Sequence, residues 1–379
     1  MASFRNAGPM CAYNNPVDIR DGTQQLCAAH PPGSLFPNLA PWASTPSIVF
    51  DSPRPGELFT IAATGPKMPD ITVSWHLAGI LPDPTDRTEF LVEAHVEFDS
   101  AACPNGSKAD DTSTRFKSAR PLAVWVGGGS CVLRFTEILG GDLKLKVSAA
   151  VGGRTIAAEL SGERIQGQDP RPEQIKALLR HKVVWRIVQQ ESHGGHQFQA
   201  APLAGGALYP KYSQDCLLGV GLGQITKTAD EPPLSQAEVW DWTANLASAS
   251  AKFRQTLTVS DQFVRDVRKS DALGKLVLAY NADRVANKLP EITVTLPDLA
   301  AEQRERDAVR GYNGFAGKDK LCSDLQLHEY RVARKDGLLV VDIAPGTTAG
   351  KAVWEVVPVD ARPKSGDPDY VTHVYEHPE

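Results

Sequence analysis

Residues 172–192 of the chain read PEQIKALLRHKVVWRIVQQES. Apolar side chains recur in this stretch at intervals of three and four residues, which is the period of a helix with one buried face; they are Ile175, Leu178, Leu179, Val183, Val184, Ile187 and Val188. Pro172 and Glu173 suit a first helical turn, because an N–H is unpaired there and acidic groups meet the positive end of the dipole. The pattern predicts a helix over 172–192.

Glu191 continues this apolar stripe, four residues after Ile187 and three after Val188. Its carboxyl group is therefore expected to project toward the interior at the helix C-terminus. Partial burial and the negative end of the helix dipole both disfavour the charged form, so we expect a raised pKa. A carboxyl group that stays protonated near neutral pH suits a general acid for glycosidic cleavage. The helix alone fits equally a structural glutamate that caps the helix end.

A glycine-dense turn occupies residues 219–226, which read GVGLGQIT. Glycine has no side chain, so Gly223 and its neighbours are expected to let the backbone approach a bound ligand closely. Gln224 would offer that ligand both a hydrogen-bond donor and an acceptor. A Tyr-Asn pair then occurs twice, in LAYNA at 278–282 and in VRGYNG at 309–314.

In this order the Glu-Ser pair, the Gly-Leu-x-Gln turn and the Tyr-Asn motif resemble the catalytic region of the soluble lytic transglycosylase and goose-type lysozyme superfamily. The resemblance covers residues 172–379. It implies a lysozyme-like helical domain with Glu191 as general acid/base and a substrate site lined by Ser192, Gly223, Gln224, Tyr312, Asn313 and Tyr280. Tyr312 is favoured over Tyr280, because DYVTHV at 369–374 is similar to the closing helix of many relatives.

The number of carboxylates bears on the mechanism. Hydrolytic glycosidases need a second acidic group about 5–9.5 Å from the first, and Asp215 and Asp230 flank the glycine turn as candidates. Each also fits an exposed loop residue. Lytic transglycosylases, by resemblance, need only the single glutamate, which helps the muramyl 6-hydroxyl to close an anhydro ring. We favour this second mechanism. Asp283 departs from the usual motif, which has glycine at that position.

The rest of the chain divides into an arm and a β-rich region. Residues 1–45 are rich in Pro, Asn, Gly and Ala and indicate an irregular arm. Between 46 and 165, seven or so short runs with period-two alternation predict an immunoglobulin-like β-sandwich.

The hydrophobic period changes after 162–172, and helices are expected at 235–256, 260–282 and 299–312 within a domain over 171–379. A β-hairpin insertion is expected at about 320–365, from strand-like runs at 338–343 and 352–357 around Pro345 and Gly346. The fold class is therefore α+β, with two domains.

Composition excludes some functions. The formal net charge of -5 argues against a protein that wraps nucleic acid, and no stretch reaches the roughly 18 apolar residues of a membrane span. No apolar run near Met1 resembles a secretory signal, so we expect synthesis in the bacterial cytoplasm and action on the cell wall of a target cell. Trp240 and Trp242 are candidates for stacking on a sugar. No cofactor or metal is expected.

Two other interpretations stay open. His193 and His196 lie close to Glu191, which suggests a metal-dependent cell-wall peptidase or amidase, although the HExxH motif is absent and a solvated loop fits better. A non-catalytic glycan-binding or phage-tail protein is the other alternative. The expected partners of the enzyme are peptidoglycan glycan strands and, if a phage or a secretion system delivers it as a toxin, a delivery apparatus and an immunity protein.

Overall fold

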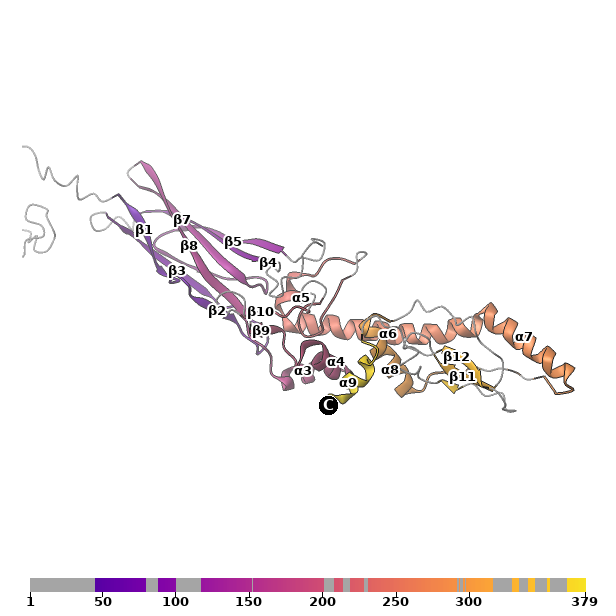
Figure 1. Ribbon diagram of the computed structural model, residues 1–379. Coiled ribbons are helices and arrows are strands. Elements are labelled where there is room, and N and C mark those ends of the chain that lie inside the picture. The colour runs from indigo at the N-terminus through magenta and orange to yellow at the C-terminus, as the bar shows by residue number, and fades with distance from the viewer. Residues whose placement is uncertain are drawn as a thin grey trace, which may run out of the picture.

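The fold is known from a computed structural model of the chain, which describes residues 45–79, 88–99, 117–151, 153–200, 208–213, 219–227, 231–291, 293, 296, 298–315, 329–333, 340–344, 353–354 and 367–379. Strands fill the described part up to residue 167, and helices dominate the described part beyond it (Figure 1). The arm expected at residues 1–45 lies outside the described residues, apart from its last residue.

Two sheets form the β-rich region. The larger has the strand order β2-β8-β7-β4-β5 and the smaller the order β1-β3-β6. Their strands are β1 (Ser47–Ser52), β2 (Leu58–Ile61), β3 (Ile71–Ala78), β4 (Phe90–Asp99), β5 (Lys117–Gly127), β6 (Ser130–Leu133), β7 (Gly141–Val151) and β8 (Arg154–Gly167). The strand pairs are antiparallel, except that β2 runs parallel to β8.

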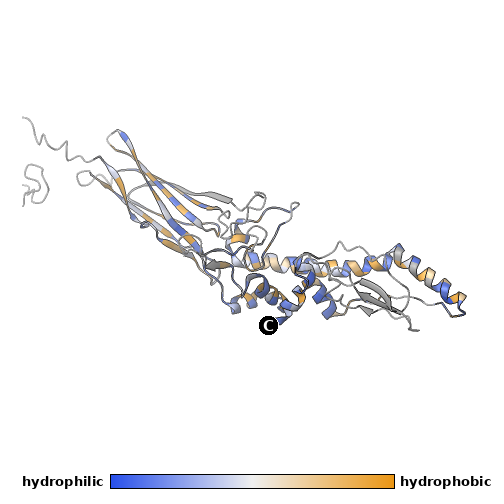
Figure 2. Ribbon diagram, in the orientation of Figure 1, coloured by the Kyte–Doolittle hydropathy of each residue, from blue (hydrophilic) through white to orange (hydrophobic). Residues whose placement is uncertain are grey.

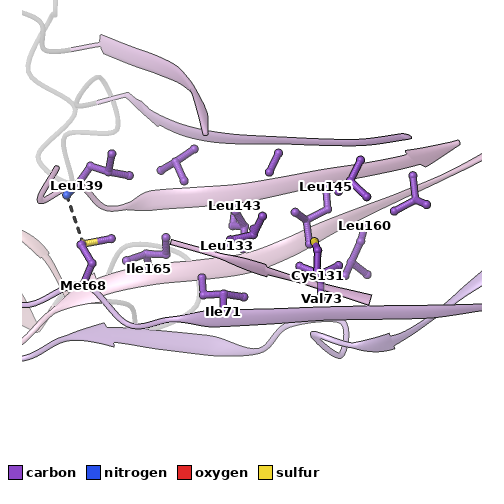
Figure 3. Close-up of a cluster of buried hydrophobic side chains, with 14 of the residues drawn as sticks. Met68, Ile71, Val73, Cys131, Leu133, Leu139, Leu143, Leu145, Leu160 and Ile165 are labelled. Carbon is purple, nitrogen blue, oxygen red and sulfur yellow. Dashed lines mark hydrogen bonds between the residues drawn. The ribbon is translucent and has the colours of Figure 1, made fainter. Parts of the chain in front are cut away.

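The two sheets share one apolar core, because each strand turns alternate side chains inward. On β7, Leu143, Leu145 and Val147 are buried while Lys144 and Lys146 are exposed, and Figure 2 shows this alternation along the long strands. Figure 3 shows side chains of both sheets meeting in the space between them. The predicted strands are therefore confirmed.

The first helical stretch is broken in two, so the prediction of one helix over 172–192 is wrong. Helix α3 spans Pro172–Leu178 and helix α4 spans Lys182–Ser192. Leu179 between them has an extended backbone, with φ −89° and ψ 130°. The break ends the helical period, and Leu178 is consequently 56% exposed instead of joining the buried stripe. The stripe from Val183 onward is buried as predicted.

The later helices also differ from the expected bounds. They are α5 (Gln236–Trp240), α6 (Trp242–Lys269), α7 (Asp271–Ala286), α8 (Ala301–Arg310) and α9 (Tyr370–Glu376), with a π-helical turn η2 (Gly311–Phe315) after α8. The interruption expected at 256–260 is absent, because α6 keeps burying one face through Ser260, Val264 and Val267. Asp241 caps the start of α6, because its carboxylate accepts from the Thr243 N–H. Helix α6 ends at Lys269, before Ser270, which caps α7. None of the described helices is long and apolar enough to cross a bilayer.

The region of the expected insertion holds a small sheet where it is described. Strand β11 (Glu329–Ala333), which was not expected, pairs antiparallel with β12 (Val340–Ala344), which lies in the predicted run at 338–343. The third strand, β13 (Val353–Trp354), lies in the predicted run at 352–357, but it pairs parallel with β11 and not with β12, so the pairing expected for the hairpin is wrong. In the view of Figure 1 this sheet is drawn below the part of α6 that leads into α7.

The β-rich and helical regions are joined by a common apolar cluster. Trp240, at the end of α5, is fully buried and packs on Phe98 of β4 with ring centroids 4.9 Å apart. Phe198 on β9 (Phe198–Ala200) lies against Gly167, and the indole of Trp240 lies against Gly140, where a methyl group would come within 2.4 Å of the ring. The prediction that Trp240 stacks on a sugar is therefore wrong. The same prediction for Trp242 is also wrong, because that side chain is 4% exposed.

A carboxylate on α5 links this helix to its neighbours and predicts a pH dependence. Glu238 accepts from the Ser235 N–H, Ser248 Oγ and Lys227 Nζ at 2.8–2.9 Å. Burial alone would raise its pKa, but these hydrogen bonds outweigh burial and lower it to about 2. A depressed carboxylate stabilises the fold above its unfolded pKa near 4.5 and loses that contribution as the pH falls toward 2.

We therefore expect Glu238→Gln to lower the free energy of unfolding at pH 7, by at most about 3 kcal/mol. The difference from wild type should shrink steadily between pH 5 and pH 2. Urea denaturation at several pH values measures it. A deficit that is constant across this range would show that the charge of Glu238 contributes nothing.

Candidate active site

Glu191 lies in the last full turn of α4, where the buried face of the helix ends. Tyr370, the first residue of α9, donates a short hydrogen bond from its hydroxyl to Oε1 of Glu191. Helix α9 packs against α4 and α8, which brings the two residues together although 179 positions separate them. Glu191 keeps part of its surface exposed. The carboxyl group is therefore enclosed by α9, while the residue as a whole keeps part of its surface exposed.

The surroundings of Glu191 raise its pKa above 4.5. The largest cause is burial, which disfavours the charged form. Two groups oppose it, since the hydroxyl of Tyr370 and the ammonium group of Lys252 both favour the carboxylate. Burial wins, so the group binds a proton more readily than an exposed glutamate does. The direction agrees with that expected from the sequence.

The end of α4 is closed by Ser192, which the resemblance places at the substrate. Its side chain is fully buried. The hydroxyl donates to the Val188 carbonyl at 2.6 Å and accepts from the N–H groups of Gly195 and His196 at 3.0 and 3.1 Å. Ser192 thus holds the chain reversal after Glu191, and its hydroxyl is fully used by the backbone. The same reversal puts His193 in the left-handed region, with φ 53°.

The backbone of the glycine turn is held by hydrogen bonds to two buried amide side chains. The Leu222 N–H donates to Oε1 of Gln197 at 2.9 Å, and the Gly223 N–H donates to Oδ1 of Asn245 at 3.0 Å. Gly221 has φ +74°, and a Cβ there would lie 2.3 Å from Oε1 of Gln197. The close approach that glycine permits is therefore used by the protein itself.

Gly223 and Gln224 both make close contacts within the protein at this turn. A Cβ on Gly223 would lie 2.5 Å from Cβ of Ala249 and 3.0 Å from the hydroxyl of Tyr312. Gln224 has φ 43° and is 7% exposed, and its Nε2 donates to the Gly221 carbonyl at 2.8 Å. The donor that we expect Gln224 to offer a ligand is thus used inside the turn.

Tyr312, on the π-helical turn, is hydrogen-bonded to the glycine turn. Its side chain is 2% exposed and its hydroxyl donates to the Gly223 carbonyl at 2.7 Å. Burial, and next the charge of Glu191, raise the pKa of Tyr312 well above 10. The carboxyl group of Glu191 accepts its hydrogen bond from Tyr370 and not from Tyr312. Asn313 is half-buried, and its Oδ1 has no hydrogen-bond partner within the described part of the chain.

The remaining predicted residues are not brought to the site by the described structure. Tyr280 belongs to α7, which extends from the far end of α6 (Figure 1), and the placement of its side chain lies outside the described part. Asp215 and Asp230 also lie outside the described residues. Of the candidate metal ligands, His196 pairs with Asp169 at 2.9 Å. Within the described ranges no three His, Cys, Asp or Glu side chains are grouped to hold a metal ion.

Four residues at the site were not predicted from the sequence. The DYVTHV stretch predicts a helix that includes Tyr370, but it does not show that this tyrosine contacts Glu191. Lys252 sits three residues after Ala249 and just before Phe253, beside the buried face of α6, a position that a solvated lysine rarely takes. Gln197 and Asn245 carry no motif, and only the folded chain shows what they hold.

Comparison with known proteins adds no relative. No protein-family model matches the chain, and no curated protein matches it either.

Tyr370→Phe tests the contact at the acid. The hydroxyl of Tyr370 favours the charged form, so its removal should raise the pKa of Glu191 further. A hydrogen bond to a charged group is worth about 1.5–3 kcal/mol, and we expect a reaction that uses this acid to slow roughly 10- to 100-fold. The alkaline fall of activity should move to higher pH. Rates measured from pH 4 to 9 on both proteins decide it. An unchanged profile would deny Tyr370 any influence on the acid.

Proposed function

We propose that this protein cleaves the glycan strands of bacterial peptidoglycan, with Glu191 as general acid and then general base. The helical region would be a lysozyme-like domain and the β-rich region an immunoglobulin-like sandwich. The observation that carries the proposal is the state of Glu191. Burial raises the pKa of its carboxyl group, Tyr370 donates a hydrogen bond to it, and the residue as a whole is partly exposed. These are the conditions for delivering a proton to a leaving oxygen.

The proposed reaction begins when Glu191 gives its proton to the glycosidic oxygen as the bond to the anomeric carbon breaks. Glu191 is then a carboxylate, which Tyr370 and Lys252 stabilise. In the second step this carboxylate accepts a proton from the attacking nucleophile. The nucleophile is the 6-hydroxyl of the same muramyl residue in a lytic transglycosylase and a water molecule in a lysozyme. The enclosed carboxylate is thus used twice, and each step balances in protons.

We favour the transglycosylase route. In the described part of the chain, the side chains that shift the pKa of Glu191 are Tyr370 and Lys252, and neither is a carboxylate. A hydrolase would need such a partner to activate water, and Asp215 and Asp230 keep that role as candidates.

The test is digestion of purified peptidoglycan sacculi with the wild-type protein, followed by mass spectrometry of the soluble fragments. The proposal expects muropeptides with anhydro ends. Fragments with reducing ends would establish a lysozyme and overturn the transglycosylase route alone. Sacculi that stay intact, while a commercial muramidase dissolves them, would contradict glycan cleavage altogether. A chelator added in parallel should change nothing, and loss of activity would favour the metal-dependent peptidase or amidase.

A further inference from the structure

Lys252 is a half-buried lysine that faces the acid site from α6. Its neighbours on that helix are buried, since Ala249 touches the glycine turn at Gly223 and Phe253 lies in the core of the helical region. Lys252 is one turn beyond Ala249, so it is carried toward the same place. An exposed surface lysine would direct its ammonium group into water, whereas this one is turned toward the interior.

The ammonium group of Lys252 is held over an aromatic ring. Nζ lies 4.4 Å from the ring centroid of Tyr312, a distance at which the negative face of the ring attracts a cation. Tyr312 itself is fixed by its hydrogen bond to Gly223. The long side chain of Lys252 is thereby given a defined position instead of many rotamers.

Lys252 is attracted by carboxylates but does not form a direct ion pair with one among the described residues. No described carboxylate oxygen lies within 4.0 Å of its Nζ. Burial lowers the pKa of Lys252, and attraction to Glu191 and next to Glu231 opposes this. Two groups favour the charged form of Glu191, the hydroxyl of Tyr370 from α9 through its hydrogen bond and the ammonium group of Lys252 from α6 through its charge. Lys252 is the cation of this set.

We propose that Lys252 is a positioning residue, a fixed positive charge that stabilises the carboxylate of Glu191 once it has given up its proton. This rests on the proposed function. A partly buried cation without a direct ion pair carries a desolvation cost, which is offset when a negative charge forms nearby. Such a charge forms on Glu191 during the first step, when the proton passes to the leaving oxygen. Lys252 keeps its own proton throughout. It therefore makes Glu191 a stronger acid without competing for the substrate.

The test compares Lys252→Met, Lys252→Arg and Lys176→Met. Lys176 is a matched control, since its ammonium group also lies over an aromatic ring, 5.2 Å from the centroid of Trp185, but does not act on Glu191. The primary readout is the titration of the Glu191 carboxyl carbon by NMR in full-length protein with labelled glutamate, assigned with Glu191→Gln. We expect the midpoint to rise in Lys252→Met and to stay at the wild-type value in Lys252→Arg and Lys176→Met.

The kinetic readout uses the same variants on sacculi. Lys252→Met should lower kcat about 10-fold, leave KM nearly unchanged and move the alkaline limb to higher pH, while Lys252→Arg restores all three. An unmoved titration midpoint in folded Lys252→Met would overturn the proposal, as would an equal shift in Lys176→Met. Wild-type protein that titrates as expected but leaves sacculi intact would remove the catalytic role and the proposed function, and would leave only the charge interaction.

Discussion

Glu191→Gln is expected to reduce peptidoglycan cleavage by about 1,000-fold. General acid–base catalysis contributes roughly 10²–10⁴-fold, and the amide can neither give a proton to the leaving oxygen nor take one from the nucleophile. Gln has nearly the shape of Glu, so the contact with Tyr370 can persist. The release of soluble fragments from sacculi measures the loss.

The same substitution should leave the fold intact or strengthen it. The raised pKa of Glu191 means that burial penalises its charged form, and a neutral amide avoids that penalty at neutral pH. Thermal unfolding at pH 7 is therefore expected at the wild-type temperature or above. The matched control is Glu137→Gln, an exposed glutamate between β6 and β7 that should change neither quantity. Full activity in Glu191→Gln would remove Glu191 from the mechanism.

Trp240→Ala is expected to destabilise the whole molecule, by about 3–5 kcal/mol. The indole is fully buried and packs on three aromatic rings, those of Phe98, Tyr209 and Phe198. Its removal leaves a cavity at the boundary of the two regions, and Gly140, which has no side chain, cannot fill it. Because the cluster includes residues of both regions, the β-rich and helical parts should unfold in one transition that moves as a unit.

Urea denaturation monitored by tryptophan fluorescence and by circular dichroism measures this effect. The two signals should coincide in the wild type and in Trp240→Ala. Leu278→Ala is the control, since that side chain is 72% exposed, and it should alter the free energy of unfolding by no more than about 0.5 kcal/mol. Two separate transitions, with only one shifted by Trp240→Ala, would mean that the regions fold independently.

Much of the fold can be derived from periodicity in the sequence. The strands of the β-rich region were predictable because Leu143, Leu145 and Val147 alternate with lysines and serine, and only a strand buries such a set on one face. The helix breaks were not, since the extended backbone at Leu179 and the unbroken run of α6 depend on packing partners far along the chain. The common cluster around Trp240 was also out of reach, because no local pattern tells which core a tryptophan joins.

The candidate site was predictable at its centre and less so around it. The position of Glu191 can be derived from one helical stripe, and the burial that raises its pKa comes from the same stripe. Its partner could not be derived this way, because two Tyr-Asn motifs and a later tyrosine competed for one place. Which tyrosine reaches the acid depends on how α9 packs on α4. Ser192 was expected at the substrate because of its motif, but its hydroxyl bonds to the backbone at the end of α4.

The protonation of Glu191 is the quantity on which the proposed mechanism depends most directly. Titrating its carboxyl carbon by NMR in the wild-type protein, with Glu191→Gln to identify the signal, measures it without any substrate. We predict a midpoint above 4.5, and an alkaline fall of cleavage activity at the same pH. A midpoint at or below 4.5 would mean that Glu191 is charged near neutral pH, and would contradict its role as the proton donor.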